Sequence, residues 1–322
     1  MHIRQLGHTD LHITPIGFGA WAIGGEWRFG WGPQDDDASI AAIRRAVSLG
    51  VNWIDTAPAY GLGHSEEVVA RALRDIPVGE RPLVFTKCSL VWDDARTVRH
   101  NLAAVSIRQE VEDSLRRLEV ERIDLYQVHW PRWAAQQEAS AGSVEEAWST
   151  LAELQRAGKL RHIGVSNFTV ADLEIARAIA PVASLQPPYS LLRRDVEREL
   201  LPYCQQHGIG VLVYSPMLSG LLTGAMTRER IEALAPSDWR RNNVEFQEPR
   251  LTKNLALVEV LRGVGERHGR SAGEVAIAWV LRHPAVTAAI VGGRSARQVE
   301  GVVGAAEFRL TPDEVAEIDS AL

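Results

Sequence analysis

Four polar residues in the first half of the chain have the types and spacing for proton transfer. Asp55 ends the apolar run V-N-W-I-D, Tyr60 follows it in T-A-P-A-Y-G, Lys87 ends L-V-F-T-K, and His129 ends I-D-L-Y-Q-V-H. A free phenol titrates at about pH 10, which is too high for efficient proton transfer at neutral pH. A nearby ammonium lowers the pKa of a phenol, and a carboxylate beside that ammonium keeps its buried charge paired. We therefore expect Lys87 to lower the pKa of Tyr60, Asp55 to hold Lys87, and His129 to orient a carbonyl.

A purely structural interpretation is also available for each residue. Asp55 and Lys87 would form an ion pair, Tyr60 would pack, and His129 would belong to the core. However, the four residues follow the ends of three consecutive apolar segments, at 53–55, 83–87 and 123–129. In a parallel barrel the C-terminal ends of the strands form the face that carries catalytic groups, so the pattern favours a shared site.

Strand-like and helix-like segments alternate along the chain. The segments that we predict to be strands span residues 16–19, 53–55, 83–87, 123–129, 162–166, 184–186, 210–214 and 286–290. Helix start signals lie at Ser106, Ser143, Ser271 and Thr311, the first three with Gln or Glu three residues later and the last with Pro312 next. Strands separated by whole helices pair in parallel.

Eight such units predict a (β/α)8 TIM barrel that spans residues 1–322 as one domain. An open, doubly wound sheet is the alternative that the count leaves open. A hairpin over residues 4–13 is expected to close the bottom of the barrel. Long irregular loops are expected at the C-terminal face over 20–34, 91–105 and 130–142, with another beyond it over 225–249.

Composition limits the classes of function. The 322 residues carry a formal net charge of −6 without a block of like charges, which argues against a nucleic-acid surface or a polybasic membrane anchor. We expect no signal peptide and no membrane span. Two cysteines suit a reducing compartment, so we expect a cytoplasmic protein. The cysteines and histidines lack ligand spacing, so no metal site is predicted.

Residues 17–22 read G-F-G-A-W-A and fit the dinucleotide fingerprint G-x-G-x-x-A. That fingerprint requires a helix to begin inside it, so that the helix N-terminus meets the pyrophosphate. Here further glycines and Pro33 follow, and helical periodicity returns only near Asp37. We interpret the segment as a barrel strand followed by a loop at an open site.

The runs D-T-A-P-A-Y-G, F-T-K, Y-Q-V-H and I-G-V-S-N together resemble the aldo-keto reductase family over nearly the whole chain. The resemblance implies that Asp55, Tyr60, Lys87 and His129 are the catalytic tetrad, with Tyr60 as the general acid. It also implies a nicotinamide dinucleotide, NADP(H) with NAD(H) as the alternative, bound at the mouth of the barrel without a Rossmann domain.

The resemblance further implies three groups of cofactor-binding residues. The residues expected to hold and stack on the nicotinamide are Ser166, Asn167, Gln186 and Tyr214. The residues expected in the pyrophosphate loop are Ser215, Met217, Leu218 and Gly220. The residues expected around the adenosine 2'-phosphate are Gly292, Arg294, Ser295 and Gln298. The chain departs from the family there, because Val291 replaces a proline and Gly301-Val302 replaces a Glu-Asn pair.

Tryptophans are concentrated in the loops after the first, third and fourth strands. The residues that we expect to wall a substrate pocket are Trp21, Trp27, Trp31, Trp92 and Trp130, with Trp133 nearby; loop anchoring is the alternative. Such walls suit a sugar or an apolar ring-bearing carbonyl. The expected function is carbonyl reduction. The alternatives are a sugar or alcohol dehydrogenase working oxidatively and a cofactor-binding redox sensor that acts as an auxiliary subunit.

Overall fold

The computed structural model describes every residue except 28, 134–140 and 237. Within the described residues, eight parallel strands close into a barrel in the order β10-β11-β12-β13-β3-β4-β5-β8. Their bounds are β3 Ile16–Gly19, β4 Trp53–Asp55, β5 Leu83–Cys88, β8 Ile123–Val128, β10 Leu160–Ser166, β11 Ser184–Gln186, β12 Gly210–Val213 and β13 Ala288–Gly292. The predicted barrel is confirmed, and the open-sheet alternative is wrong. Two strands are displaced by two residues: β10 begins two residues earlier than expected, and β13 begins and ends two residues later.

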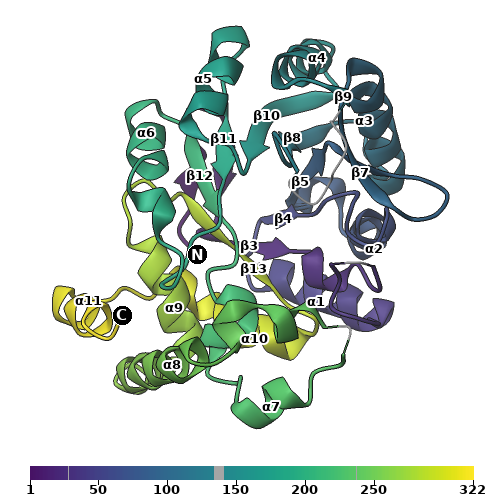
Figure 1. The fold of residues 1–322 in the computed structure, drawn as a ribbon. Coiled ribbons are helices and arrows are strands. Elements are labelled where there is room, and N and C mark those ends of the chain that lie inside the picture. The colour runs from purple at the N-terminus through teal and green to yellow at the C-terminus, as the bar shows by residue number, and fades with distance from the viewer. Residues whose placement is uncertain (28, 134–140, 237) are drawn as a thin grey trace.

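Helices surround the ring of strands (Figure 1). They are α1 Asp36–Ser48, α2 His64–Leu73, α3 Ala104–Leu118, α4 Val144–Arg156, α5 Val170–Ile179, α6 Leu200–Gln206, α7 Arg228–Glu232, α8 Arg250–Glu266, α9 Ala272–Leu281, α10 Ala296–Val303 and α11 Pro312–Asp319. The 3-10 turns span Trp21–Ile23, Val78–Glu80, Asp195–Glu197, Leu218–Thr223, Trp239–Asn242, Val244–Phe246 and Gly304–Ala306. None of the described helices has the length and apolar character needed to cross a membrane.

Three of the four predicted helix starts are confirmed. Ser143, Ser271 and Thr311 each accept a hydrogen bond from the backbone N–H three residues on, and the last two form full capping boxes. The start at Ser106 is wrong, because α3 begins at Ala104. The Ser106 hydroxyl instead donates to the Glu110 carboxylate at 2.9 Å.

The interior of the barrel is filled and closed from below. Trp53 and Phe85 lie inside it with ring centroids 5.2 Å apart. A Cβ on Gly17 would come within 2.2 Å of the Trp53 ring, so this glycine makes room for the indole. The predicted hairpin is confirmed as β1 Arg4–Gln5 paired with β2 His12–Ile13. Its apolar side chains, among them Leu6, pack in the same interior cluster and so form the floor beneath the polar site.

The expectation of an irregular loop over 91–105 is wrong. Strand β6 Leu90–Trp92 pairs antiparallel with β7 Val98–Leu102. Strand β7 also pairs with β9 Ala141–Gly142, which brings the connections after β5 and β8 into one small sheet. The expected loop over 130–142 lies partly outside the described residues.

The segment over 225–249 folds back as short turns around its own apolar cluster. Met226, Ile231 and Phe246 pack with Leu221 and Leu251. This packing fixes the 3-10 turn Trp239–Asn242 near the C-terminal face, where Trp239 contacts the loop between β3 and α1. A polar segment without clean periodicity therefore becomes part of the wall of the site.

Candidate active site

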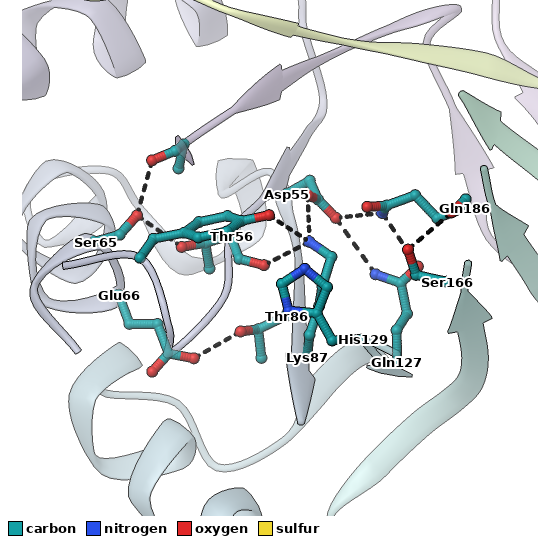
Figure 2. Close-up of polar contacts among 12 residues, drawn as sticks. Asp55, Thr56, Ser65, Glu66, Thr86, Lys87, Gln127, His129, Ser166 and Gln186 are labelled. Atoms are coloured by element: carbon teal, nitrogen blue, oxygen red, sulfur yellow. Dashed lines mark hydrogen bonds and ion pairs between the residues drawn. The ribbon is translucent and has the colours of Figure 1, made fainter. Parts of the chain in front are cut away.

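Lys87 is the centre of a buried polar group at the C-terminal ends of β4 and β5. Its ammonium donates to Asp55 Oδ1 at 2.6 Å, to the Thr56 carbonyl at 2.9 Å and to Tyr60 Oη at 3.4 Å (Figure 2). The Lys87 side chain is fully buried. An ammonium has three N–H groups, so these contacts account for all of its donors and hold its position.

Tyr60 lies in the tight turn between β4 and α2. A Cβ on Gly61 would fall 1.8 Å from the Gly24 carbonyl, and Gly61 has a φ of +68°, so glycine is required for this close approach. The Ser65 hydroxyl donates to the Ala20 carbonyl at 3.0 Å, which ties the turn to the end of β3. The turn is thus anchored on two sides, and this fixes the phenol beside Lys87.

His129 completes the tetrad expected from the sequence. Its ring meets the Tyr60 ring edge to face, with centroids 5.8 Å apart. Burial, reinforced by the Lys87 charge, lowers the pKa of His129 well below its usual value. The imidazole is therefore neutral at neutral pH and contributes no positive charge to the site.

The expectation of a lowered pKa for Tyr60 is wrong, because its net pKa shift is upward. Burial, with a smaller contribution from the Asp55 carboxylate, raises the pKa of the Tyr60 phenol well above its usual value. Burial also lowers the pKa of Lys87, against the opposing effect of Asp55. Because Asp55 balances the ammonium at 2.6 Å, little net positive charge reaches the phenol. Tyr60 is accordingly a protonated donor over the whole physiological pH range.

Two side-chain amides lie behind the tetrad, of which Gln186 was predicted as a cofactor-binding residue and Gln127 was not predicted. Asp55 Oδ2 accepts from Gln186 Nε2 at 2.8 Å and from Gln127 Nε2 at 3.3 Å, and Gln186 Nε2 also reaches Gln127 Oε1 at 3.2 Å. Both amides point toward Asp55 (Figure 2). Gln127 lies in β8, which ends at Val128, and His129 directly follows that strand; strand alternation continued by one residue would place both side chains on one face. That alternation was the signal that could have identified Gln127.

Trp92 does not join the pocket. It lies in β6 and contacts the Arg117 guanidinium, whose Cζ is 5.8 Å from the indole centroid. Arg117 in turn donates to the buried Glu66 carboxylate, which also accepts from Thr86 at 2.6 Å. The small sheet turns Trp92 outward toward α3, which the expectation of an irregular loop did not foresee.

One large pocket, with a volume of about 740 Å³, opens at the barrel mouth. The sequence-predicted residues that line it are Asp55, Tyr60, His129, Ser166, Asn167, Gln186, Tyr214, Ser215, Met217, Gly220, Gly292, Arg294, Gln298, Trp21, Trp27, Trp31 and Trp130. Lys87 lies beneath it. Leu218 packs against the apolar clusters, and Ser295 caps α10 by accepting from the Gln298 amide. The structure thus gathers nearly all the predicted residues around one cavity.

Hydrogen bonds join the residues at the ends of β10, β11 and β12. The Asn167 side chain donates to the His129 carbonyl at 3.0 Å and accepts from Tyr214 Oη at 2.8 Å. Ser166 donates to the Gln186 carbonyl at 2.8 Å. Asn167 has a φ of +60°, a conformation that asparagine tolerates better than most residues. This network fixes the Tyr214 ring as one flat wall of the pocket.

Arg294 connects the start of α10 with the loop between β3 and α1. Its guanidinium donates to Gln34 Oε1 at 2.5 Å, to the Pro33 carbonyl at 2.7 Å and to the Trp31 carbonyl at 3.4 Å. Its backbone N–H donates to Gln298 Oε1 at 2.8 Å. Arg294 therefore lines the pocket while it also holds the Trp31 loop in place.

The aromatic side chains of the pocket form two groups. One surrounds Tyr60, because Trp27 lies 6.1 Å from the Tyr60 ring, Phe29 lies 5.5 Å from Trp27, and Trp133 lies 6.1 Å from Phe29. The other joins Trp21, Trp31 and Trp239, with centroid separations of 5.5, 5.8 and 6.3 Å. Phe29, Trp239 and Arg240 line the pocket without having been predicted.

Within the described ranges, no three His, Cys, Asp or Glu side chains are grouped as a metal site would require. Both cysteines are buried and unpaired. The pocket places the Tyr60 hydroxyl among several hydrogen-bonding side chains and aromatic walls.

Comparison with known proteins agrees with this geometry. A sequence model of the Aldo/keto reductase family matches residues 15–322. Aldo-keto reductase YhdN of Bacillus subtilis is 37% identical over 323 residues, which cover 100% of this chain and 94% of that protein. NADH-specific methylglyoxal reductase of Escherichia coli is 35% identical over 95% of this chain and 94% of its own length.

A solved structure of a glycerol dehydrogenase from Gluconobacter oxydans superposes with a TM-score of 0.88 at 40% identity. The superposition covers 99% of this chain and 94% of that one. The family match over nearly the whole chain, the relatives above 30% identity and the shared barrel agree with one another, and this chain belongs to the aldo/keto reductase family of oxidoreductases.

Proposed function

We propose that this protein reduces an aldehyde, ketone or sugar carbonyl to an alcohol, with NADP(H) as its cofactor and Tyr60 as the general acid. The observation that carries the proposal is the contact of the Tyr60 hydroxyl with Lys87 Nζ at 3.4 Å, beside an ammonium paired with Asp55 at 2.6 Å. A phenol held in this way, in the wall of a large pocket, is positioned to donate a proton to a substrate oxygen.

The residues present fit a nicotinamide dinucleotide. The pocket is large enough and runs from Tyr60 to the Arg294 connection. Tyr214 offers a flat wall against which an aromatic ring can stack. Ser166, Asn167 and Gln186 lie beside it and would hold the carboxamide, although Gln186 already donates to Asp55 and Gln127. When bound, the nicotinamide supplies the hydride.

The protein's own side chains would transfer the proton and orient the substrate carbonyl. Tyr60 donates its proton to the carbonyl oxygen as charge develops there, and its raised pKa keeps that proton available at neutral pH. His129 is neutral and faces the Tyr60 ring, so it would orient the carbonyl without competing as a cation. Asp55 would hold Lys87 in place, and the Lys87 ammonium would stabilise the phenolate left after proton transfer.

The aromatic group around Tyr60 would bind the substrate. Trp27, Phe29 and Trp133 present apolar faces near the phenol, together with Trp130 and Leu90. Such walls suit the C–H faces of a sugar or an apolar carbonyl compound. Trp27 Nε1 is buried without a hydrogen-bond partner in the described part of the chain, so it would donate to a substrate oxygen.

Turnover with a panel of aldehydes, ketones and sugars tests the proposal, with NADPH and NADH compared in parallel. NADPH-dependent reduction supports it. A preference for NADH would place the protein with its relative from Escherichia coli, whose name specifies NADH. Tight binding of the cofactor without turnover of any carbonyl would contradict the proposal and favour a redox-sensing auxiliary subunit.

Alcohol oxidation is a second candidate function, and the similarity to a glycerol dehydrogenase at 40% identity favours it. The same residues would act in reverse, with the Tyr60 phenolate as the base. Polyol oxidation measured with NADP+ and NAD+ at several pH values separates this direction from reduction. Because the pKa of Tyr60 is raised, oxidation should require alkaline conditions.

A further inference from the structure

Two polar side chains outside the tetrad bind the backbone of Trp130, the residue that directly follows His129. The Trp130 N–H donates to Ser89 Oγ at 3.3 Å, and the Ser89 hydroxyl lies 3.3 Å from the Trp130 carbonyl, to which it donates. His100 Nε2 lies 2.8 Å from the same carbonyl. Ser89 follows β5 and His100 lies in β7, so two separate segments hold one residue of the pocket wall.

His100 is the donor in its contact with Trp130, because a carbonyl oxygen can only accept. Burial lowers the pKa of His100, against the opposing effect of the Trp130 carbonyl. The ring is therefore neutral at neutral pH and carries a single N–H, which the carbonyl keeps on Nε2. A buried imidazole fixed in one tautomer acts as a rigid support rather than as a group that exchanges protons with a substrate.

The small sheet that carries His100 also contacts the side chain of Trp130. Leu90 lies opposite His100 in the β6–β7 pair and lines the pocket. Leu90 and Val98 form an apolar cluster against which the Trp130 side chain packs. The sheet of β6, β7 and β9 thus holds Trp130 through its backbone and through its ring.

The position of His129 depends on the same peptide. The His129 carbonyl and the Trp130 N–H belong to one planar peptide unit. Asn167 donates to that carbonyl at 3.0 Å, and Ser89 accepts from that N–H at 3.3 Å. A rotation of this unit would move His129, whose ring meets the Tyr60 ring edge to face.

We propose that Ser89 and His100 are positioning residues for carbonyl reduction: they clamp Trp130, and through its peptide they set the orientation of His129 and the shape of the wall that receives the substrate. This inference rests on the proposed function. Among the described residues that line the pocket, neither Ser89 nor His100 is present, so both would act through Trp130. The proposal gives the small sheet a role in catalysis, because a misplacement of about 1 Å near reacting groups can lower a rate about 100-fold.

His100→Leu tests the clamp, because leucine keeps apolar bulk and removes the donor. Arg99→Gln is the matched control, since Arg99 is the adjacent residue of β7, is exposed and pairs with Asp93. Steady-state reduction of acetaldehyde and benzaldehyde by each purified full-length protein gives kcat and KM. Calorimetric titration gives the dissociation constant of NADPH, and circular dichroism verifies the fold.

In His100→Leu we expect kcat to fall about tenfold with both aldehydes, because His129 would orient the carbonyl of each. KM should rise only with benzaldehyde, because only the ring-bearing substrate would reach the Trp130 wall. NADPH binding should be unchanged, because Tyr214 and Arg294 are held by other contacts. Arg99→Gln should match the unaltered protein in every quantity.

A purely structural role for His100 gives a different result. It would lower kcat alike for both aldehydes by reducing the folded fraction, and it would leave both KM values unchanged. That outcome overturns the proposal. Unchanged constants in His100→Leu, or an equal loss in Arg99→Gln, overturn it as well.

His100→Gln and Ser89→Ala test the clamp even if the leucine variant fails to fold. The side-chain amide of glutamine can donate where imidazole Nε2 does, so His100→Gln should stay close to the unaltered protein. Ser89→Ala removes the hydroxyl alone and should raise KM for benzaldehyde by a smaller factor than His100→Leu, because its contacts are longer.

An unchanged KM for benzaldehyde in Ser89→Ala, or a loss in His100→Gln as large as that in His100→Leu, would exclude these hydrogen bonds as the cause. Failure of the unaltered protein to reduce either aldehyde would instead contradict the proposed function itself. The two failures are therefore distinguishable.

Discussion

At the scale of single residues, the site concentrates its chemistry in one phenol whose proton is held by burial. Tyr60 is the only tetrad member that both lines the pocket and carries a raised pKa. Lys87 and Asp55 are mutually satisfied beneath it. In the proposed mechanism Tyr60 donates the proton, and Lys87 with Asp55 positions the phenol.

Tyr60→Phe should keep the fold and cofactor binding but lose most turnover. The ring that contacts Trp27 and His129 is retained, whereas the phenolic proton is removed. A positioned acid typically contributes about 10²–10⁴-fold to the rate. Steady-state carbonyl reduction and cofactor titration measure the two properties separately. Carbonyl reduction close to that of the unaltered protein would exclude Tyr60 as the general acid.

The pH dependence of catalysis follows from the directions of the two pKa shifts. Tyr60 has a raised pKa and His129 a lowered one. Reduction, which needs the protonated phenol and the neutral imidazole, should be flat through neutral pH and fall at the alkaline end. Alcohol oxidation, which needs the phenolate, should rise with pH. Initial rates in both directions across the pH range check these expectations.

Lys87→Met should displace the oxidation profile further to the alkaline side. Removal of the ammonium 3.4 Å from the phenol oxygen leaves the Asp55 carboxylate unbalanced, which raises the pKa of Tyr60 still more. The double variant Lys87→Met/Asp55→Asn is the control, because it removes both charges and should move the profile less. Oxidation rates are measured against pH for the unaltered protein, the single variant and the double variant. Superimposable profiles would show that Lys87 does not affect the pKa of Tyr60.

At the scale of elements, α3 supports the end of β5 through a buried acid. Glu110 accepts from the Ser89 backbone N–H at 2.8 Å and from the Ser106 hydroxyl at 2.9 Å. Ser89 has a φ of +82° and directly follows the strand that carries Lys87. The contact holds a backbone conformation that serine rarely adopts, two residues after Lys87.

Glu110→Gln should make stability less dependent on pH. Burial raises the pKa of Glu110 to about 8. The folded state therefore holds a proton that the unfolded chain releases, and this stabilisation is complete below the unfolded pKa and disappears as pH rises through about 8. The unaltered protein should lose up to about 1.4 kcal/mol per pH unit across that range.

Urea unfolding at several pH values measures the effect of that substitution. The side-chain amide introduced by Glu110→Gln retains an acceptor for the Ser89 N–H but cannot ionise. Glu112 is exposed on the same helix. Glu112→Gln should therefore leave the change of unfolding free energy with pH as it is in the unaltered protein. If the unfolding free energy of Glu110→Gln changes with pH as it does in the unaltered protein, Glu110 does not titrate in this range.

At the scale of the whole molecule, the pocket is built from segments far apart in the chain. The loop between β3 and α1, the segment after α7 and the start of α10 meet at Trp31, Arg240 and Arg294. A ligand bound there would contact segments from the N-terminal and C-terminal parts of the chain. It should therefore stabilise the entire fold rather than one loop.

Saturating cofactor should accordingly raise the melting temperature. Ligand at one hundred times its dissociation constant adds about 2.7 kcal/mol to the free energy of unfolding, or roughly 4 °C for a chain of this length. Differential scanning calorimetry with and without NADPH measures the shift. An unchanged melting temperature at concentrations that saturate calorimetric binding would contradict binding to the folded state.

Removal of metal ions should have no effect on turnover. The described residues contain no group of three potential ligands, and the proton donor is a phenol. Dialysis against a chelator, followed by an activity assay with and without added zinc, tests this expectation. Activity lost on dialysis and restored by zinc would contradict a mechanism based on Tyr60.

The sequence by itself determined eight parallel strands with a polar face, whereas the closure of these strands into a barrel was a prediction that left an open sheet possible. Eight apolar segments separated by helices imply parallel pairing, and parallel pairing brings the ends of the strands carrying Asp55, Lys87 and His129 together. Gln127 was not predicted, although it lies two residues before His129, where strand alternation would place both side chains on one face. Local start signals identified the starts of α4, α9 and α11, because a cap depends only on residues within one turn.

Only the tertiary structure decided what depends on burial and on the paths of the long connections. The pKa of Tyr60 rises because its surroundings exclude water and Asp55 balances Lys87, and neither condition can be read from spacing. Trp92 leaves the pocket because β6 pairs with β7. Arg240 joins Arg294 at Trp31 although 54 positions separate the two arginines. Contacts between distant loops depend on how each loop packs, and no local pattern encodes that packing.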